Sequence, residues 1–142
     1  MKSALIPSLV VLGLALAGCA TTAVPAAPRH ACLEGEKSAQ VVQLFFGRNV
    51  GQTPGVSEKD WETFLDKEIV PRFPDGLSVI DTAGVWKGKD GSAVHELGKA
   101  VVIVLSGRPE DQARLGEVTS AYKARFSQES VLTSRSRSCV AF

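Results

Sequence analysis

The side chains best suited to chemistry in this chain of 142 residues are one histidine next to an acid, and an aromatic residue upstream. His95 is followed directly by Glu96 within a run of strand-forming residues. If the preceding turn centres on Asp90-Gly91, His95 lies opposite Trp86, where it would act as a general base or a ligand contact beside an aromatic wall. The alternative, which we favour, is a half-exposed strand histidine packed on Trp86.

Two arginines are the next candidates for ligand contacts. Arg48 directly follows a strand-like run, and Arg72 is held in a proline-rich frame. Either guanidinium is suited to bind a carboxylate or a phosphate. The simpler interpretation is a salt bridge to an acid such as Asp75 or Glu68. The candidate ligand contacts are therefore Arg48, Arg72, Trp86 and His95.

Local motifs of catalysis are missing from the sequence. It contains no glycine-rich phosphate loop, no His-x-x-x-His, no Cys-x-x-Cys and no Gly-x-Ser-x-Gly. A Ser-His-Asp triad would have to use His95, and no neighbouring motif points there. We therefore predict no catalytic residue, no metal ligand and no cofactor, and we lean towards a protein that is not an enzyme.

Residues 1–18 have the three parts of a secretory signal. A positive start at Lys2 precedes an apolar run that ends in Leu16-Ala17-Gly18-Cys19. The run is shorter than the roughly 20 apolar residues that span a bilayer. Small residues before a cysteine resemble the lipobox of lipoproteins, so we predict cleavage before Cys19 and acylation of its thiol; an ordinary signal peptide with an incidental cysteine is the alternative. Ala20 follows, and by resemblance to enterobacterial sorting rules this favours the outer membrane.

The other two cysteines, Cys32 and Cys139, form an even pair in a chain predicted to be exported. In an oxidising compartment one disulfide is the default expectation. Free thiols or a metal pair are the alternatives, but two cysteines without a nearby histidine offer too few ligands for zinc. A bridge closing so long a loop would stabilise the fold by up to about 4–5 kcal/mol in the chain-entropy model.

Length and charge limit the class of protein. Residues 19–142 suffice for one domain and not for two. Without Lys2 the chain has 15 basic and 15 acidic side chains, and Arg135 with Arg137 is the nearest approach to a basic cluster. This composition argues against nucleic acid as a partner. Small residues and prolines follow Cys19, so we expect a lipidated flexible tether over residues 19–36 and a single domain over 37–142.

Hydrophobic patterns and chain breakers predict six elements. A first helix begins at the N-cap Ser57, with Asp60 three residues later, and ends at Pro71. A second helix begins near Pro109. A loop covers Gly51–Gly55, a turn covers Lys89-Asp90-Gly91, and Gly84 is a candidate bulge. Strands are expected at Gln40–Phe46, Leu77–Trp86, Ala93–Leu97 continuing as Ala100–Leu105, and Ser130–Phe142.

The order of these elements predicts the fold. A β-α-β-β-α-β order is typical of the α+β, ferredoxin-like class, with a four-stranded antiparallel sheet in the order 4-1-3-2 and two helices on one face. In this topology the start of the first strand lies beside the end of the fourth, which would bring Cys32 close to Cys139. The fourth strand would be an edge strand, and Arg135 and Arg137 would protect it from aggregation.

Several segments of the predicted domain resemble a known family. They are Phe46-Gly47-Arg48, Val56-Ser57 with Trp61 and Phe64, Pro71 to Gly76, Gly84-Val85-Trp86, Tyr122 to Val131, and Cys139. Residues 44–142 thereby resemble the small bacterial lipoproteins of the domain of unknown function 3574 family. The resemblance implies an envelope lipoprotein and no particular activity.

Three functional interpretations follow, and the third of them is a purely structural lipoprotein that needs no specific partner. The first is a lipid-anchored envelope module without catalytic activity, which binds a protein or a small ligand. The second is a small-molecule-binding protein or small enzyme related to dimeric α+β barrels, in which two such sheets enclose a pocket lined by candidates such as Arg48, Trp86 and His95. The predicted partners are the lipid bilayer through acylated Cys19, an envelope protein or small ligand, and a second copy of the chain.

Overall fold

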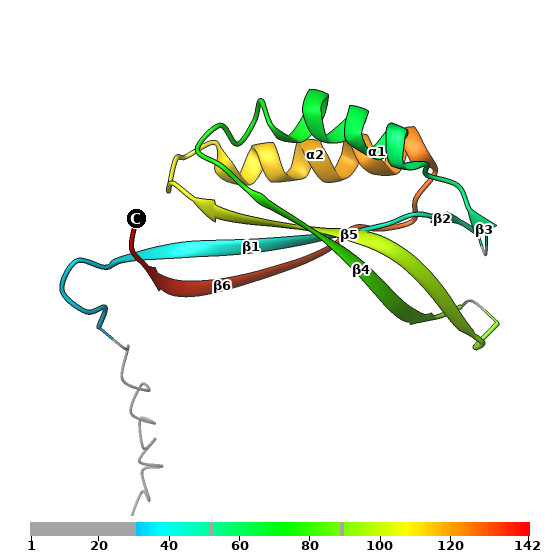
Figure 1. The fold of residues 1–142 in the computed structure, drawn as a ribbon, viewed down its shortest axis with the longest axis horizontal. Helices are drawn as coiled ribbons and strands as arrows, with labels where there is room; N and C mark the ends of the chain where they lie inside the picture. Colours follow the sequence, from blue (N-terminus) through cyan, green and yellow to red (C-terminus); the bar gives the residue numbers. More distant parts are fainter. Residues whose placement is uncertain (1–30, 52, 89) are drawn as a thin grey trace, which may run out of the picture. The chain divides into compact units, whose positions relative to one another are not determined.

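The computed structural model describes residues 31–51, 53–88 and 90–142, and Ala31–Phe142 form one compact unit. The predicted signal peptide, Cys19 and most of the predicted tether lie outside the described residues. Within the described part, no helix is long and apolar enough to cross a membrane. Figure 1 shows two helices above one face of a twisted sheet.

The sheet has the order β4-β5-β1-β6, and all neighbouring strands are antiparallel. The predicted α+β, ferredoxin-like fold with both helices on one face is therefore confirmed (Figure 1). A small hairpin of β2 and β3 replaces the loop expected over Gly51–Gly55. The elements are β1 (Lys37–Gly47), β2 (Asn49–Val50), β3 (Thr53–Pro54), α1 (Glu58–Phe64), the π-helical turn η1 (Leu65–Ile69), β4 (Ser78–Lys87), β5 (Ala93–Leu105), α2 (Asp111–Phe126) and β6 (Leu132–Val140).

A side-chain cap begins α1, whereas α2 begins with an acid in its first turn. The Ser57 hydroxyl accepts a hydrogen bond from the Asp60 amide at 3.1 Å and donates to the Asp60 carboxylate at 2.6 Å. This is the predicted N-cap, in which an aspartate replaces the usual glutamate or glutamine three residues later. At the first position of α2, the buried Asp111 carboxylate accepts hydrogen bonds from the Gly107 and Arg108 amides of the preceding loop. A charge aimed at a helix N-terminus is stabilising there.

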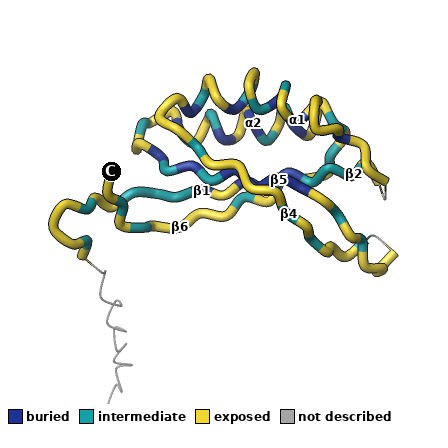
Figure 2. The backbone as a smooth tube through the Cα atoms, in the orientation of Figure 1, coloured by how far each residue is buried: buried dark blue, intermediate teal, exposed yellow. Residues whose placement is uncertain are grey.

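The core lies between the helices and the sheet and is centred on aromatic rings. Figure 2 shows that buried positions follow the inner faces of α1, α2 and the central strands. Ring centroids are 4.8 Å apart between Phe46 and Tyr122 and 5.0 Å apart between Phe64 and Tyr122. Trp61 and Phe126 complete this cluster. These rings join β1 to α1 and α2 and hold both helices against the sheet.

The β4–β5 hairpin runs in unbroken register, so the bulge expected at Gly84 is wrong. Gly84 pairs directly with Glu96. The glycine is explained by the neighbouring indole, because a Cβ at position 84 would lie 3.3 Å from Nε1 of Trp86. The Trp86 side chain therefore folds back along the strand over Gly84.

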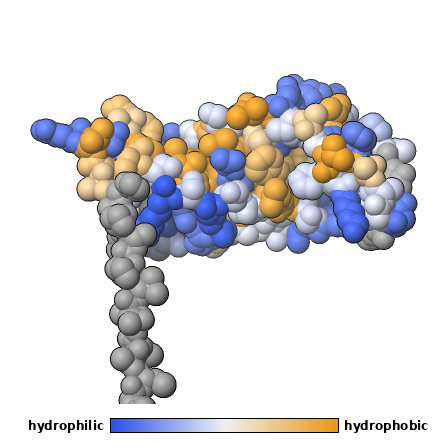
Figure 3. Space-filling model, turned by 90° about the horizontal axis from the view of Figure 1, so that it is seen from below, coloured by the Kyte–Doolittle hydropathy of each residue, from blue (hydrophilic) through white to orange (hydrophobic). Residues whose placement is uncertain are grey.

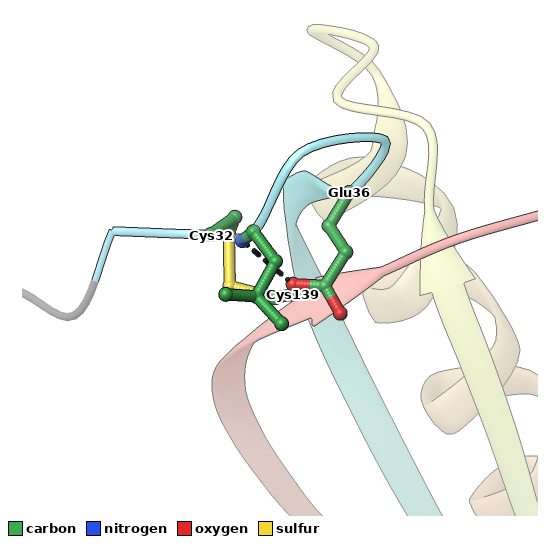
Figure 4. Close-up of a disulfide and its surroundings, with 4 residues drawn as sticks. Cys32, Glu36 and Cys139 are labelled. Atoms are coloured by element: carbon green, nitrogen blue, oxygen red, sulfur yellow. Dashed lines mark hydrogen bonds between the residues drawn. A yellow bond between two sulfur atoms is a disulfide. The ribbon is translucent and has the colours of Figure 1, made fainter.

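The segment before β1 is tied to the last strand by the predicted disulfide. Cys32 and Cys139 are bonded through their sulfur atoms, with Cα atoms 5.4 Å apart (Figure 4). The register of β1 and β6 pairs Ser38 with Cys139, which places the two ends of the domain together. Residues 31–36, expected at the end of the tether, include a turn in which the Leu33 amide donates to the Glu36 carboxylate.

Candidate functional site

One face of the sheet is not covered by the helices, and a cleft opens at one end of it. Side chains alternate along β1, so Val42, Leu44 and Phe46 enter the core while Val41 and Phe45 point to the opposite face. We call this opposite side the open face; Figure 3 shows apolar surface gathered across it. The cleft has a volume of about 600 Å³ and is lined by Phe45, Gly47, Asn49, Gly51, Trp86, Lys87, Gly88, Val94, Glu96, Ser127, Gln128, Glu129, Ser130 and Leu132.

The floor of the cleft is built around the Glu96 carboxylate. Its Oε1 accepts a hydrogen bond from the Asn49 amide at 2.9 Å. The carboxylate lies directly over Gly47, where a Cβ would come within 2.5 Å of Oε1. Only glycine at position 47 leaves room for this arrangement. An acid that is half-buried and oriented by a backbone amide is a fixed negative charge at the cleft.

Apolar side chains form the second part of the lining. The Trp86 side chain is 45% exposed and Leu132 is 50% exposed, although both are large and apolar. Phe45 pairs with Leu132 across β1 and β6, and Trp86 pairs with Val94 across the hairpin. The cleft thus combines a half-exposed indole with a carboxylate, a pairing suited to flat or cationic organic groups.

The loop between α2 and β6 supplies a polar wall. Ser127 ends α2 in the left-handed conformation, with φ of 52°, which turns the chain sharply towards the cleft. Gln128 is then fixed by its side-chain amide, which donates to the Asn49 carbonyl at 2.6 Å and to the Phe126 carbonyl at 3.3 Å. This hydrogen bonding fixes the loop after α2. It also brings residues 128–130 beside the β4–β5 hairpin.

Tyr122 connects the aromatic core to the floor of the cleft. Its side chain is fully buried, and its hydroxyl donates to the Gly47 carbonyl at 2.7 Å. Burial raises the pKa of the Tyr122 phenol well above its usual value. The phenol therefore stays protonated as a hydrogen-bond donor and holds Gly47 in place beneath Glu96.

His95 does not lie beside Trp86, contrary to the prediction. The register pairs His95 with Val85 and Trp86 with Val94. The hairpin closes with a hydrogen bond from the Gly88 amide to the Ser92 carbonyl. The turn is therefore centred on Asp90, half a residue before the predicted centre between Asp90 and Gly91. Because successive strand residues point to opposite faces, this difference puts His95 on the other side of the sheet from Trp86.

Arg48 is absent from the cleft lining and joins a charge network beneath α1. Its Nη1 donates to Glu58 at 2.8 Å, and Glu58 also accepts from Lys99 at 2.6 Å. Lys99 is buried and bonds Asp81 as well, at 2.5 Å. Hydrogen bonds from Lys99 lower the pKa of Glu58 and of Asp81. Burial opposes the charge on Lys99, but its bonds to Asp81 and Glu58 outweigh burial and raise its pKa. The network fixes α1 to the sheet.

Arg72 is also engaged within the fold. Its Nη1 donates to the Glu68 carbonyl at 2.7 Å and to the Glu68 carboxylate at 3.0 Å. Its Nε donates to Glu117 of α2 at 3.0 Å. The ion pair with Glu68 is one that the sequence suggested, whereas Asp75 pairs with Arg108 instead. Arg72 thus caps η1 and joins it to α2, away from the cleft.

Cys32, Glu36 and Cys139 are the one group in the described residues whose ligand atoms lie close enough to hold a metal ion, within 4.8 Å of one another. Both sulfur atoms are committed to the disulfide, as Figure 4 shows. A disulfide sulfur is not the thiolate that a metal requires. This cluster is therefore a covalent clamp with a carboxylate beside it.

Comparison with known proteins identifies the family. Residues 41–142 match the model of the family described as protein of unknown function (DUF3574). The chain belongs to the DUF3574 family. Three of the segments that carry this resemblance contribute residues to the cleft, namely Gly47, Trp86 and Gln128–Ser130. No curated protein matches the chain in sequence.

Solved structures show the same fold as this DUF3574 domain. A phage SAM lyase in complex with S-methyl-5'-thioadenosine has 17% sequence identity and a TM-score of 0.57, covering 82% of this chain and 97% of the lyase. A phage SAM lyase in the apo state has 21% identity and a TM-score of 0.54, covering 81% and 97% of the two chains. At these identities the likeness concerns the fold.

The sequence identified one of the cleft residues of this DUF3574 domain as a candidate contact, Trp86. It did not predict Phe45, Asn49 or Glu96 as contacts, because their positions in the cleft depend on strand register. A signal for that register was present in Asp90 and Ser92. The Asp90 carboxylate accepts hydrogen bonds from the Ser92 amide and hydroxyl, a side-chain turn that closes the hairpin between Gly88 and Ser92.

Proposed function

We propose that the domain binds a small organic ligand with a flat ring in the cleft, as a lipid-anchored module of the cell envelope. The observation that carries the binding proposal is the half-exposed Trp86 indole facing a cleft that also holds the fixed Glu96 carboxylate. A volume of about 600 Å³ falls in the range of small-molecule sites. Large exposed apolar side chains beside convergent polar groups are typical of such sites.

The chemistry of the cleft favours a nucleoside-sized ligand. Trp86 and Phe45 offer ring faces for stacking, which contributes roughly 1–3 kcal/mol per base in other proteins. Glu96 accepts hydrogen bonds or balances a positive charge, and the serines of residues 127–130 offer hydroxyl groups to a sugar. The likeness in fold to a phage SAM lyase in complex with S-methyl-5'-thioadenosine makes that nucleoside a suitable first probe.

Replacing Trp86 should weaken binding of this probe. In isothermal titration of the purified chain with S-methyl-5'-thioadenosine, we expect saturable binding by the wild type and an affinity about tenfold lower for Trp86→Ala, because stacking is lost. The tryptophan fluorescence of the wild type should also change when the probe is added. Trp61 is 1% exposed, so a change on adding the probe reports Trp86.

Val85→Ala provides a matched control for the Trp86 variant. Val85 is the neighbouring strand residue, is 58% exposed and points to the opposite face of the sheet. It should bind the probe as the wild type does. Absence of saturable binding at millimolar probe, or equal affinities of Trp86→Ala and Val85→Ala, would contradict the proposed ligand class.

A catalytic role for the same cleft is the second candidate, favoured by the oriented Glu96 carboxylate and by a structural neighbour that is a lyase. Glu96 would act as the general base. Mass spectrometry of SAM incubated with the chain separates the two candidates. Turnover by the wild type that is lost in Glu96→Gln indicates catalysis, and unchanged SAM indicates binding alone.

The proposed envelope location is supported by the lipobox-like Leu16-Ala17-Gly18-Cys19. An acylated Cys19 would hold the domain at the membrane, on the periplasmic side of the outer membrane if Ala20 follows the enterobacterial rule. Two or more acyl chains anchor a protein firmly, whereas one does so marginally.

Mass spectrometry of the membrane fraction should find a mature N-terminal peptide that begins at Cys19 and carries acyl chains. Cys19→Ser should lose the modification and leave the membrane fraction, because the thiol is the site of acylation. Cys32 is not expected to carry lipid, since its sulfur is in the disulfide. An unmodified mature protein in the soluble fraction of the wild type would refute the anchor.

A further inference from the structure

The open face of the sheet is apolar and almost free of charge. Large apolar side chains on its two edge strands include Ile80 of β4, which is 52% exposed, and Leu132 of β6, which is 50% exposed. Figure 3 shows this apolar surface running across the face. We infer that the open face packs against the open face of a second copy of the chain, and that the second copy covers the cleft.

The charge pattern favours a copy of the same chain. Among the side chains that alternate onto the open face from β1, β4, β5 and β6, only Lys37 and Glu96 are charged. The uncharged polar positions are mostly serines, such as Ser134 and Ser136 of β6. Two identical faces of this kind meet without bringing rows of like charges together, which is what an interface between copies requires.

The same pattern disfavours a lipid surface as the occupant. Faces that dock on anionic bilayers combine apolar side chains with lysines and arginines. Arg135 and Arg137 alternate with the serines of β6 and therefore point to the helix side of the sheet. Lys37 alone, at the end of β1, does not make a basic rim.

The area of the open face is sufficient for a stable pair. Four strands spaced about 4.8 Å apart and about 10 residues long span roughly 600 Å². Pairing two such faces would bury about 1,200 Å², the lower end of the range for specific interfaces. The twist of the sheet leaves a hollow at the end of the face, and this is where the cleft lies.

Association would also complete the cleft. Phe45, Trp86 and Leu132 belong both to the open face and to the cleft lining. A second copy would therefore cover the exposed parts of Trp86 and Leu132. This inference does not depend on the proposed ligand, because it concerns the mass of the particle and not its binding activity.

Sedimentation of the full chain in density-matched detergent tests the inference. We expect a protein mass of at least two copies for the wild type and of one copy for Ile80→Glu, which places a charge on the open face. Val70→Glu is the matched control. Val70 is 44% exposed and lies just after η1 in the helix layer, so this variant should keep the wild-type mass.

Far-ultraviolet circular dichroism and the melting temperature should show that Ile80→Glu is as well folded as Val70→Glu, since both positions are exposed. If Ile80→Glu unfolds, Leu132→Glu replaces it with the same expected mass. A wild type with the mass of one copy overturns the inference. If the non-acylated Cys19→Ser chain then binds phospholipid vesicles, a lipid surface is the occupant of the open face instead. An associated wild type whose mass is unchanged in Ile80→Glu also overturns it.

Discussion

Loss of the Cys32–Cys139 disulfide is expected to lower the free energy of unfolding by about 4 kcal/mol, because the bridge closes a loop over a sequence separation of 107 residues. A cross-link of this span removes much of the conformational freedom of the unfolded chain. Chemical denaturation of the oxidised and reduced wild type measures the difference, and Cys32→Ser with Cys139→Ser should reproduce the reduced form.

Glu36→Gln tests whether the bond itself is responsible. This variant keeps the disulfide and alters only the carboxylate that accepts the Leu33 amide, so its stability should stay within about 0.5 kcal/mol of the wild type. A loss of less than about 1 kcal/mol on reduction would show that the unfolded chain is not appreciably restricted by the bridge.

Tyr122→Ala is expected to destabilise the domain by about 3–5 kcal/mol, since it leaves a cavity at the centre of the aromatic core. Tyr122→Phe keeps the ring and removes only the hydroxyl that donates to Gly47. It should cost about 1–2 kcal/mol, because the partly buried Gly47 carbonyl loses the hydrogen bond from the phenol. Thermal and urea unfolding of both variants measure these differences.

Lys123 is the exposed neighbour of Tyr122 on α2, and Lys123→Ala serves as the control variant. This substitution should change the free energy of unfolding by less than about 0.5 kcal/mol. Tyr122→Phe should also loosen the floor of the cleft, so probe binding should weaken more than in Lys123→Ala. Equal stability of Tyr122→Phe and the wild type would show that water replaces the phenol as the donor to Gly47.

The fold was accessible from the sequence because its signals are local. Capping by Ser57, the helical spacing of Trp61 and Phe64, and the doubly apolar run of β5 each specify one element, and the order of the elements then allows few topologies. The disulfide followed from the even pair Cys32 and Cys139, and the ferredoxin-like order supported it because this order brings the start of β1 beside the end of β6. The structure shows both features.

The cleft was less accessible because it depends on pairing between distant segments. The predicted centre of the β4–β5 turn was wrong by half a residue. The prediction therefore placed His95 on the same face as Trp86, whereas the structure has Glu96 there. Gly47 belongs to a segment that carries the family resemblance. A glycine is needed there because the Glu96 carboxylate, 49 positions further along the chain, occupies the space of a side chain. Arg48 and Arg72 have the chemistry of anion-binding residues, yet nearby acids satisfy both within the fold. Their partners could not be chosen among many acids without the three-dimensional arrangement.

The position of the disulfide has a mechanical consequence for an anchored protein. A pulling force transmitted along the chain from residue 19 would reach the domain at Cys32, before it reaches β1. The covalent bond to Cys139 divides that load between β1 and β6, which are paired over nine positions from Lys37 to Phe45. The first strand therefore cannot be peeled from the sheet one hydrogen bond at a time. With the proposed anchor at Cys19, the domain would bear such a force without losing β1, one of the two central strands of its sheet.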